Sequence, residues 1–587
     1  MKISRFILIF TAVLIFAACS GNNSEMYDYP DDENGSGKTD NDKDNEKADT
    51  EISDEDAENQ DGSDTQKSDD DTNSTDDDDI NDEDDTDTDS DSETQDGDTT
   101  DSDIEPDIED DEDWEELPDI EPDLGTAVYV DKYNGDDSND GTMTSPVKTI
   151  AKAVQLSSAF ERNLIVLAWG VFDNMPLLKS GVSITGGYKN QNGTWVEDKE
   201  LPLIQVPATG LKLENLQQIT LSKIKIASKT DANPSGSSLG LILNKCRNIT
   251  LKQMEIVSAD GTDGTDGENG AKGDDGGNGS NGIAGCEATS GIFADIVCET
   301  SCTVTPVGAA GGSSTCGANG GKGGNAGQAE SAGSAGANGA GSTTNGGKGG
   351  NDKYWSDIKN ECSRSSSASV NGQDGLKGSN GADGNGGKSY GTFSVSGYTP
   401  SDGEDGTDGT NGQGGGGGGG GKGGTKYCNS YGSSGGGGGA GGCGGTGGKG
   451  GKGGGASIAL MIFSSKNIIF ESPSLETGKG GNGGKGGDGR DGGKKGFGGN
   501  AGTYGGKGEQ DDGGCGGWGG DGGNGGNGGN GGGGGGGPTI CVVYDTNSTL
   551  YESSSMKCDN QTPGNGGASK SNKGSSGISE KIHKIDL

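Results

Sequence analysis

The stretch LKLENLQQITLSKIKI at residues 211–226 returns as LILNKCRNITLKQMEI at 241–256. The two copies lie 30 residues apart, need no gap, and share six of 16 residues. Apolar and polar residues alternate in both, a spacing that predicts β-strands with one buried face. The side chains expected to point inward are those of Leu241, Leu243, Ile249 and Leu251, and that of Lys252 is expected to point outward.

A third copy, SIALMIFSSKNIIFESPSL, occupies 457–475, and a weaker match covers 540–556. Each copy is predicted to hold two short strands separated by a polar turn around Asn248 or Asn467. One copy alone would expose its apolar face, whereas stacked copies bury it. The repeat therefore predicts rungs of one column. A β-sandwich whose strands are similar by coincidence is the alternative.

The stretch YVDKYNGDDSNDGTMTSPVKTIAKAV at 129–154 predicts a short strand, a turn and an amphipathic helix within 149–160. This order resembles the opening segment of secreted bacterial proteins of the pectin-lyase-like superfamily. The resemblance implies an all-β fold, a right-handed parallel β-helix with an N-terminal cap that shields the first coil. The Gly-rich stretches would then be long loop insertions, and the acidic N-terminal stretch a disordered linker.

Glycine accounts for 125 of the 587 residues, and 104 of these lie within 261–537. Every third residue is Gly from 261 to 282 and again from 513 to 537. Neither run contains Pro, which argues against a collagen triple helix. Such segments resemble the PE-PGRS repeat proteins and the Gly-rich domains of certain phage adhesins and insect antifreeze proteins. That resemblance implies a polyglycine-II bundle, in which bare backbones pair; a disordered loop is the alternative.

The expected organisation follows from these features. The β-helix begins with an N-terminal part at 125–260 and resumes in coils at 456–477 and 538–558. Two Gly-rich insertions at 261–455 and 478–537 interrupt it, and 559–587 is expected to be a flexible tail.

The N-terminal segment has the pattern of an export signal. Residues 1–18 form a signal peptide, with Lys2 and Arg5 before a short apolar run, and the tetrad FAAC that ends at Cys19 resembles the bacterial lipobox. The resemblance implies lipid on Cys19 and a lipoprotein anchored at the outer membrane or cell surface; an ordinary secretory signal is the alternative. The stretch 19–124 is then a disordered tether, because residues 25–124 hold 48 acidic and four basic side chains.

The chain has 12 cysteines. With Cys19 lipidated, Cys246 is the best candidate for a free thiol, and an exported chain permits the rest to pair. A zinc site at Cys298 and Cys302 is the alternative for those two. The candidate disulfide cysteines are Cys286, Cys298, Cys302, Cys316, Cys362, Cys428, Cys443, Cys515, Cys541 and Cys558.

No catalytic residue and no cofactor is assigned. The single His and the net charge of −48 argue against paired-histidine chemistry and nucleic-acid binding. The stretches that end at Asp488 and Asp521 match half of an RTX calcium repeat, yet the apolar residue that should follow is absent. The metal ligands stay unknown, and calcium is the candidate metal for these stretches.

The sequence favours a non-catalytic structural or adhesive module at the cell surface. Its partners would be the membrane, through the lipid, and a surface glycan or envelope component. The alternative is a carbohydrate-active β-helix enzyme, a polysaccharide lyase or hydrolase, although the outward coil residues show no paired carboxylates. Aromatic residues of the Gly-rich region either stack on sugar rings or fill gaps between glycine segments. These residues are Tyr354, Trp355, Tyr390, Tyr427, Tyr431, Tyr504 and Trp518.

Overall fold

The computed structural model describes most of the chain beyond residue 122. The described residues are 123–173, 175–286, 304–341, 345–346, 370–424, 430–503, 513–551 and 556–586, all within one compact unit, 109–587. The signal peptide, Cys19 and the tether up to residue 122 lie outside the described residues. So do four of the candidate cysteines, Cys298, Cys302, Cys362 and Cys428.

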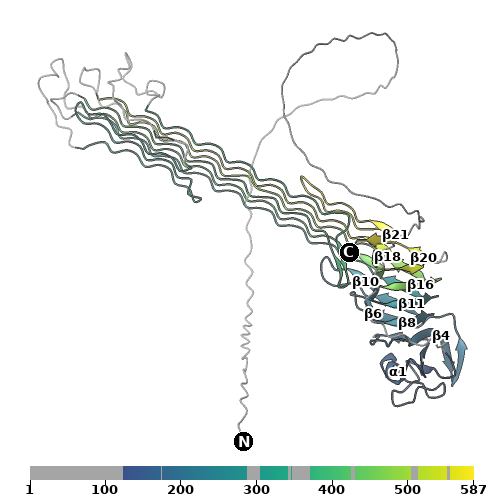
Figure 1. Ribbon diagram of the computed structural model, residues 1–587. Coiled ribbons are helices and arrows are strands. Elements are labelled where there is room, and N and C mark those ends of the chain that lie inside the picture. The colour runs from purple at the N-terminus through teal and green to yellow at the C-terminus, as the bar shows by residue number, and fades with distance from the viewer. Residues whose placement is uncertain are drawn as a thin grey trace, which may run out of the picture. The chain divides into compact units, whose positions relative to one another are not determined.

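Three sheets of parallel strands make up most of the regular structure (Figure 1). The first runs β1-β2-β4-β8-β11-β16-β19, with β5 antiparallel to β4. The second runs β21-β18-β15-β10-β7, and the third runs β20-β17-β12-β9-β6-β3. A separate antiparallel hairpin pairs β13 with β14.

The bounds of the strands are as follows. The first sheet contains β1 (Val128–Val130), β2 (Leu164–Ala168), β4 (Ser183–Gln191), β5 (Thr194–Glu197), β8 (Gln217–Ser222), β11 (Arg247–Lys252), β16 (Lys466–Glu471) and β19 (Leu550–Tyr551). The second contains β7 (Leu211–Glu214), β10 (Ser238–Asn244), β15 (Ser457–Phe463), β18 (Thr539–Asp545) and β21 (Ser579–Ile585). The third contains β3 (Val171–Phe172), β6 (Leu203–Val206), β9 (Lys225–Ser228), β12 (Glu255–Ser258), β17 (Ser474–Thr477) and β20 (Lys557–Asp559). The hairpin consists of β13 (Thr392–Ser394) and β14 (Gly397–Thr399).

Consecutive strands visit the three sheets in turn, so each set of three forms one rung. The complete rungs are β7-β8-β9, β10-β11-β12, β15-β16-β17 and β18-β19-β20. Each strand pairs in parallel with its equivalent in the next rung. This all-β arrangement is compatible with a parallel β-helix.

The inward residues of the rungs share one hydrophobic core. Leu241 and Leu460 face each other in register between β10 and β15, and neither is exposed to solvent. Leu243, Ile249 and Leu251 belong to the same core, whereas Lys252 is exposed, as the alternation predicts. The copies at 211–226, 241–256 and 457–475 are thus successive rungs of one column.

The rungs turn at residues with left-handed backbone conformations. Lys245, for example, has a φ of 51° and sits between β10 and β11, and its equivalents Asn215 and Ser464 have φ values of 56° and 45°. Such angles are uncommon for residues other than Gly, so their return in each rung marks a fixed corner. Each repeat contains three strands, not the expected two, and Asn248 lies inside β11 instead of in a turn.

The only described helix, α1 (Ile150–Leu156), lies where the sequence predicts it. Thr149 caps its first turn, because the Thr149 hydroxyl accepts a hydrogen bond of 3.1 Å from the N–H of Lys152. Ile150, Ala153 and Val154 are buried and join the core at its N-terminal end.

The segment 559–587 does not behave as the expected flexible tail where it is described. Strand β21 pairs with β18 along its whole length and so extends the second sheet by one strand. Before it, Gly564 and Gly577 form backbone hydrogen bonds of 2.9 Å to Gly537 and Gly564, respectively. The tail is tied down because its alternating residues continue the rung pattern and its glycines continue the Gly-rich pairing.

Candidate functional site

The three long Gly-rich excursions leave the rungs at one and the same corner, between the third sheet and the second. The first excursion starts after Ser258 and returns at Ser457, and the hydroxyl groups of these two residues are 2.8 Å apart. The next two excursions connect β17 with β18 and β20 with β21. Because successive rungs stack, the excursions are placed side by side, as Figure 1 shows. Together we call them the glycine bundle, with described segments at 261–286, 304–341, 370–388, 401–424, 430–455, 478–502, 513–537 and 562–578.

The bundle inherits the register of the strands. β12 pairs with β17 at an offset of 219 residues, for example Glu255 with Ser474. The side chain of Asn281, far along the first excursion, still bonds the N–H of Asn500, 219 residues later. The strands therefore set which glycines meet, although the partners are distant in sequence.

The segment 430–455, here called the central segment, is surrounded by other segments. Its N–H groups donate along three rows, exemplified by Gly437 to Ser280, Gly436 to Gly517 and Gly438 to Gly321. Its carbonyls accept along three rows, exemplified by Gly499 to Gly437, Gly418 to Gly436 and Gly312 to Gly438. Each row repeats every three residues, which is compatible with a polyglycine-II bundle.

Glycine is required where the segments touch. A Cβ added to Gly439 would overlap the carbonyl oxygen of Gly496, and one added to Gly442 would overlap that of Gly493. One row of the central segment admits side chains at most positions, among them Ala440, Cys443 and Thr446, although Gly437 in that row is as tightly packed as Gly439. The bundle is thus packed backbone against backbone, with almost no side-chain core.

Rows of Asp and Asn side chains stitch the outer segments together. In the first excursion, Oδ1 of Asp263, Asp266 and Asn269 accepts N–H groups of Asn482, Lys485 and Asp488 at 2.6–2.7 Å. Asn371 and Asp374 do the same for Trp518 and Asp521 at 2.9 and 2.8 Å. Asp and Asn serve equally, so the acceptor oxygen is what the position requires. We call these rows the Asx ladders.

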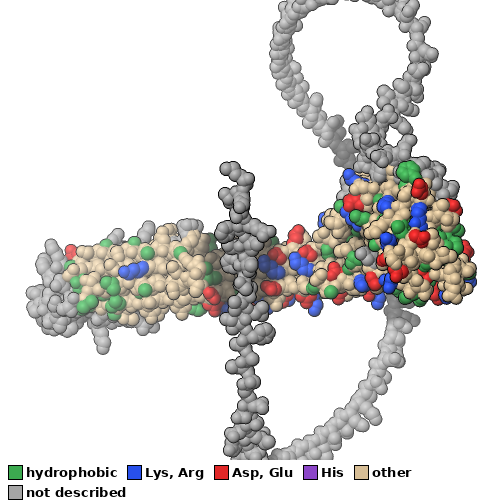
Figure 2. All heavy atoms as spheres, turned by 90° about the horizontal axis from the view of Figure 1, so that it is seen from below, with side chains coloured by type: hydrophobic (Ala, Val, Ile, Leu, Met, Phe, Trp, Pro, Cys, Tyr) green, Lys and Arg blue, Asp and Glu red, His purple; other side chains and the backbone are tan. Residues whose placement is uncertain are grey.

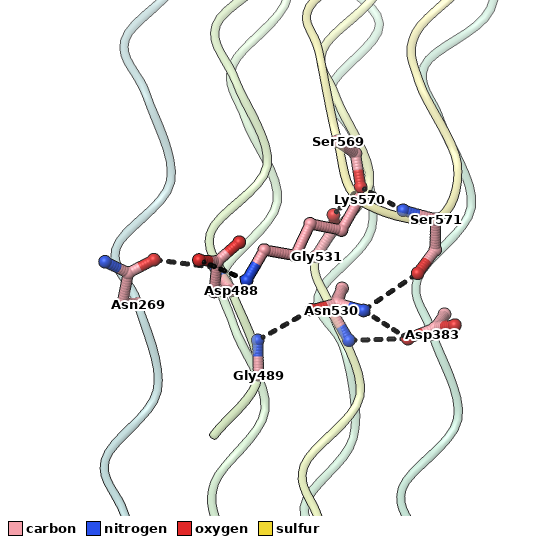
Figure 3. A network of polar contacts seen from close by, with 9 residues as sticks. All are labelled: Asn269, Asp383, Asp488, Gly489, Asn530, Gly531, Ser569, Lys570 and Ser571. Carbon is pink, nitrogen blue, oxygen red and sulfur yellow. Dashed lines mark hydrogen bonds and ion pairs between the residues drawn. The ribbon is translucent and has the colours of Figure 1, made fainter. Parts of the chain in front are cut away.

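One cross-section of the ladders connects five segments (Figure 3). Asn530 accepts from the N–H of Gly489 at 3.1 Å, donates its own N–H to Asp383 at 2.6 Å, and donates its side-chain amide to Ser571 at 2.8 Å. Beside it, Lys570 forms an ion pair of 2.8 Å with Asp488. These polar side chains are occupied with neighbouring segments.

Two carboxylates of the bundle, those of Asp405 and Asp383, have lowered pKa values because neighbouring groups donate hydrogen bonds to them. The pKa of Asp405 lies below its ordinary value because the Lys449 ammonium, 2.9 Å away, and the N–H of Gly450 both donate to it. The N–H of Asn530 and the hydroxyl of Ser571 lower the pKa of Asp383. On the face drawn in Figure 2, charged side chains gather on the half of the bundle nearer the strands.

The two Asp residues of the RTX-like stretches are held in this way. Asp488 pairs with Lys570, and Asp521 pairs with Lys495 at 2.8 Å while it accepts the N–H of Gly498 at 2.9 Å. Within the described ranges, no three His, Cys, Asp or Glu side chains gather so that they could hold a metal ion.

The described cysteines form separate disulfides in the glycine bundle and in the rungs. Cys316 forms a disulfide with Cys443 inside the bundle, and Cys541 forms one with Cys558 across the last complete rung. Cys286 and Cys515 are also disulfide-bonded. Cys246 is a buried free thiol between β10 and β11, and burial raises its pKa.

The outward coil residues, which a carbohydrate-active enzyme would use, are largely paired with oppositely charged side chains of the same strand or of a neighbouring one. Their ion pairs are Lys212 with Glu214 at 3.2 Å, Lys223 with Glu197 at 3.3 Å, Lys225 with Glu255 at 3.0 Å and Lys252 with Glu471 at 2.7 Å. These exposed pairs are typical of a solvated face and contribute little stability each.

The described aromatic residues of the Gly-rich region divide into two groups. Tyr431 is buried, and its backbone pairs with that of Cys286, so it fills space between segments. Tyr390 is 40% exposed and lies beside the hairpin, next to Phe393 and His583. Tyr354, Trp355, Tyr427 and Tyr504 lie outside the described residues.

Sequence reasoning missed the ladders, although a signal for them exists. The outer segment 261–286 carries Gly in one row of three, with Asp or Asn in most positions of another. The central segment carries Gly in two rows of three. The number of Gly rows thus separates surface segments from surrounded ones.

Comparisons of the chain with protein families, curated proteins and solved structures gave no match. No described helix is both long and apolar enough to cross a membrane.

Proposed function

We propose that the chain is a lipid-anchored protein of the cell surface, and that its folded part is a non-catalytic structural or adhesive module. In this proposal the rungs form a right-handed parallel β-helix, capped at its N-terminal end by α1 and carrying a polyglycine-II bundle as an arm. Cys19 holds the lipid, and the acidic stretch up to residue 124 is the tether.

The observation that carries the proposal is the shared corner of the excursions. A chain that only needed long loops would not require them to leave successive rungs at one corner in continuous register. Side by side, they make an arm whose strength comes from backbone hydrogen bonds. Eight Gly triplets at about 3.1 Å per residue give it a length of about 75 Å. Such an arm suits display or coating.

The polar ladders support a structural role over a catalytic one. Their oxygens are bonded to neighbouring segments, and the carboxylates of Asp405 and Asp402 pair with Lys449 and Lys452. A polysaccharide lyase needs carboxylates and a base aimed at substrate. The charged groups of the ladders instead pair within the bundle, and those of the coil faces pair within the rungs.

Cells that produce the full chain test the proposal. We expect them to adhere to immobilised envelope polysaccharide, the Cys19→Ala variant to appear in the medium, and Gly439→Val to stay anchored but adhere poorly. Phe497→Ala, on an exposed row of the same bundle, is the matched control and should adhere like the unaltered chain. Cleavage of an acidic polysaccharide by the full chain in the presence of Ca²⁺ would instead support the enzyme.

A further inference from the structure

A small cavity lies where the bundle meets the last strand of the second sheet. It has a volume of about 320 Å³ and lies between Tyr390, Gly391, Thr392 and Phe393 on one side and the residues from His583 to Asp586 on the other. This volume is at the small end of the roughly 300–1,000 Å³ that ligand sites occupy. The cavity therefore has room for a small ligand only.

The rings of Tyr390 and Phe393 form one wall of the cavity, and the ring of His583 meets them from the other side. His583 meets Tyr390 edge-on at 5.0 Å between ring centroids and Phe393 at 5.4 Å, and Tyr390 lies 6.0 Å from Phe393. Phe393 is buried in a cluster with Leu239 and other residues on the outer face of the second sheet, so this wall is fixed. Tyr390 is 40% exposed and presents its ring to solvent.

Hydrogen bonds hold the surrounding groups in place. The N–H of Gly391 donates to the hydroxyl of Tyr398 at 2.8 Å, which fixes the backbone beside Tyr390. Nδ1 of His583 lies 2.8 Å from a carboxylate oxygen of Glu580, which orients the imidazole ring. The site needs little rearrangement to receive a ligand.

The lining has the mixed character that a sugar ring requires. Aromatic rings offer an apolar surface for the C–H face of a pyranose, while Thr392 and Asp586 offer hydrogen-bonding groups for its hydroxyls. The Asp586 carboxylate would repel the carboxylate of a uronic acid, which favours a neutral sugar. We propose that this cavity binds one neutral pyranose residue, stacked on Tyr390. This inference rests on the proposed function, because it names the ligand class of the adhesive module.

His583 supplies a direct test, because it is the only histidine of the chain. The full chain, produced with ¹³C-labelled histidine, gives a single imidazole signal, which we follow while methyl glycosides of neutral hexoses are added. We expect a saturable shift of that signal. Tyr390→Ala should weaken binding about tenfold, a loss that corresponds to about 1.4 kcal/mol. Tyr390→Phe should bind like the unaltered chain, since it keeps the stacking ring.

Tyr551→Ala is the matched control, because Tyr551, on β19, is also exposed to solvent and does not line the cavity. The inference is overturned if the His583 signal does not shift with any neutral glycoside in the millimolar range. It is also overturned if Tyr390→Ala leaves the shift unaltered. An equal response to phenol would indicate an unselective apolar cleft and also overturn it. Adhesion of cells without a shift of His583 refutes only this cavity, whereas a shift without adhesion refutes only the adhesive role. Comparing free glycosides with an intact polysaccharide shows whether a free sugar or a polymer residue is bound.

Discussion

The rungs and the glycine bundle are both ordered, but side chains pack the interior of the rungs and backbone packs the interior of the bundle. In the rungs, side chains such as Leu241 and Leu460 fill a dry interior, and burial of apolar surface stabilises the stack. In the bundle, the interior consists of backbone, and a single methyl group at Gly439 has no space. The comparison teaches that the first region specifies the register, since its side chains interlock. The second region only propagates that register through hydrogen bonds that any Gly triplet could make.

The largest expected effect comes from the core of the rungs. Leu460→Ala should cost about 2–5 kcal/mol, because it leaves a cavity between two rungs. The unfolding of these rungs can be read from alkylation of Cys246, a thiol that is 1% exposed, with the labelled site identified by mass spectrometry. We expect faster labelling in Leu460→Ala. The exposed Tyr551→Ala variant should label like the unaltered chain, and equal rates in all three would contradict a shared core.

Loss of the bundle disulfide should come next. Cys316 and Cys443 are 127 residues apart in sequence, and removal of a bond that closes so long a loop should cost about 2–4 kcal/mol. In a Cys316→Ser/Cys443→Ser double variant, we expect faster hydrogen exchange across the central segment while Cys246 stays protected. Simultaneous exposure of Cys246 would mean that the two regions unfold as one unit.

The sequence predicts the rungs better than the bundle for a physical reason. Leucines that alternate at 241 and 243 carry their own burial pattern, so the strands and their pairing follow from the repeat. The sequence pattern predicts one strand where each rung has its second and third strands. The reason is that β12 has only four residues and the corner at Gln253 uses a left-handed residue that is not Gly. The corner thus lacks the usual turn signal.

The candidate sites depend on contacts that local sequence does not contain. An Asp such as Asp263 bonds a residue 219 positions away, and the cavity joins Tyr390 of the first excursion to His583 on β21. Once the rungs are placed, however, the offset of 219 follows from their register. The ladders could therefore have been derived from the repeat, whereas the cavity requires the position of the hairpin.

A single methyl group in the bundle should have a smaller effect than the disulfide. Gly439→Ala forces the central segment away from Gly496, and overpacking of this kind costs about 1–3 kcal/mol. We expect faster hydrogen exchange in 430–455 and unaltered labelling of Cys246. Phe497→Ala, whose side chain is 59% exposed, should exchange like the unaltered chain. If hydrogen exchange in 430–455 were as slow in Gly439→Ala as in the unaltered chain, the central segment would not be packed backbone against backbone.

The smallest effect concerns the charge of the Asx ladders. Since the pKa of Asp405 is lowered by the Lys449 ammonium and the Gly450 N–H, its contribution to stability is complete above the unfolded value of about 3.9. That contribution is lost as the pH falls below this value through the folded pKa. After correction for intrinsic exchange, we expect the protection of the Gly450 amide to fall below about pH 4, while the strand amides of β10 and β15 stay protected.

Asp405→Asn separates the charge from the hydrogen bond in that experiment. Asn411 occupies the equivalent position two triplets along the same ladder and accepts the N–H of Gly444 at 2.9 Å. An Asn at 405 should therefore keep Gly450 protected and remove its pH dependence, with only the exposed ion pair to Lys449 lost. If Gly450 became unprotected at all pH values, the ladder would depend on charge, and the shared use of Asp and Asn along it would need another cause.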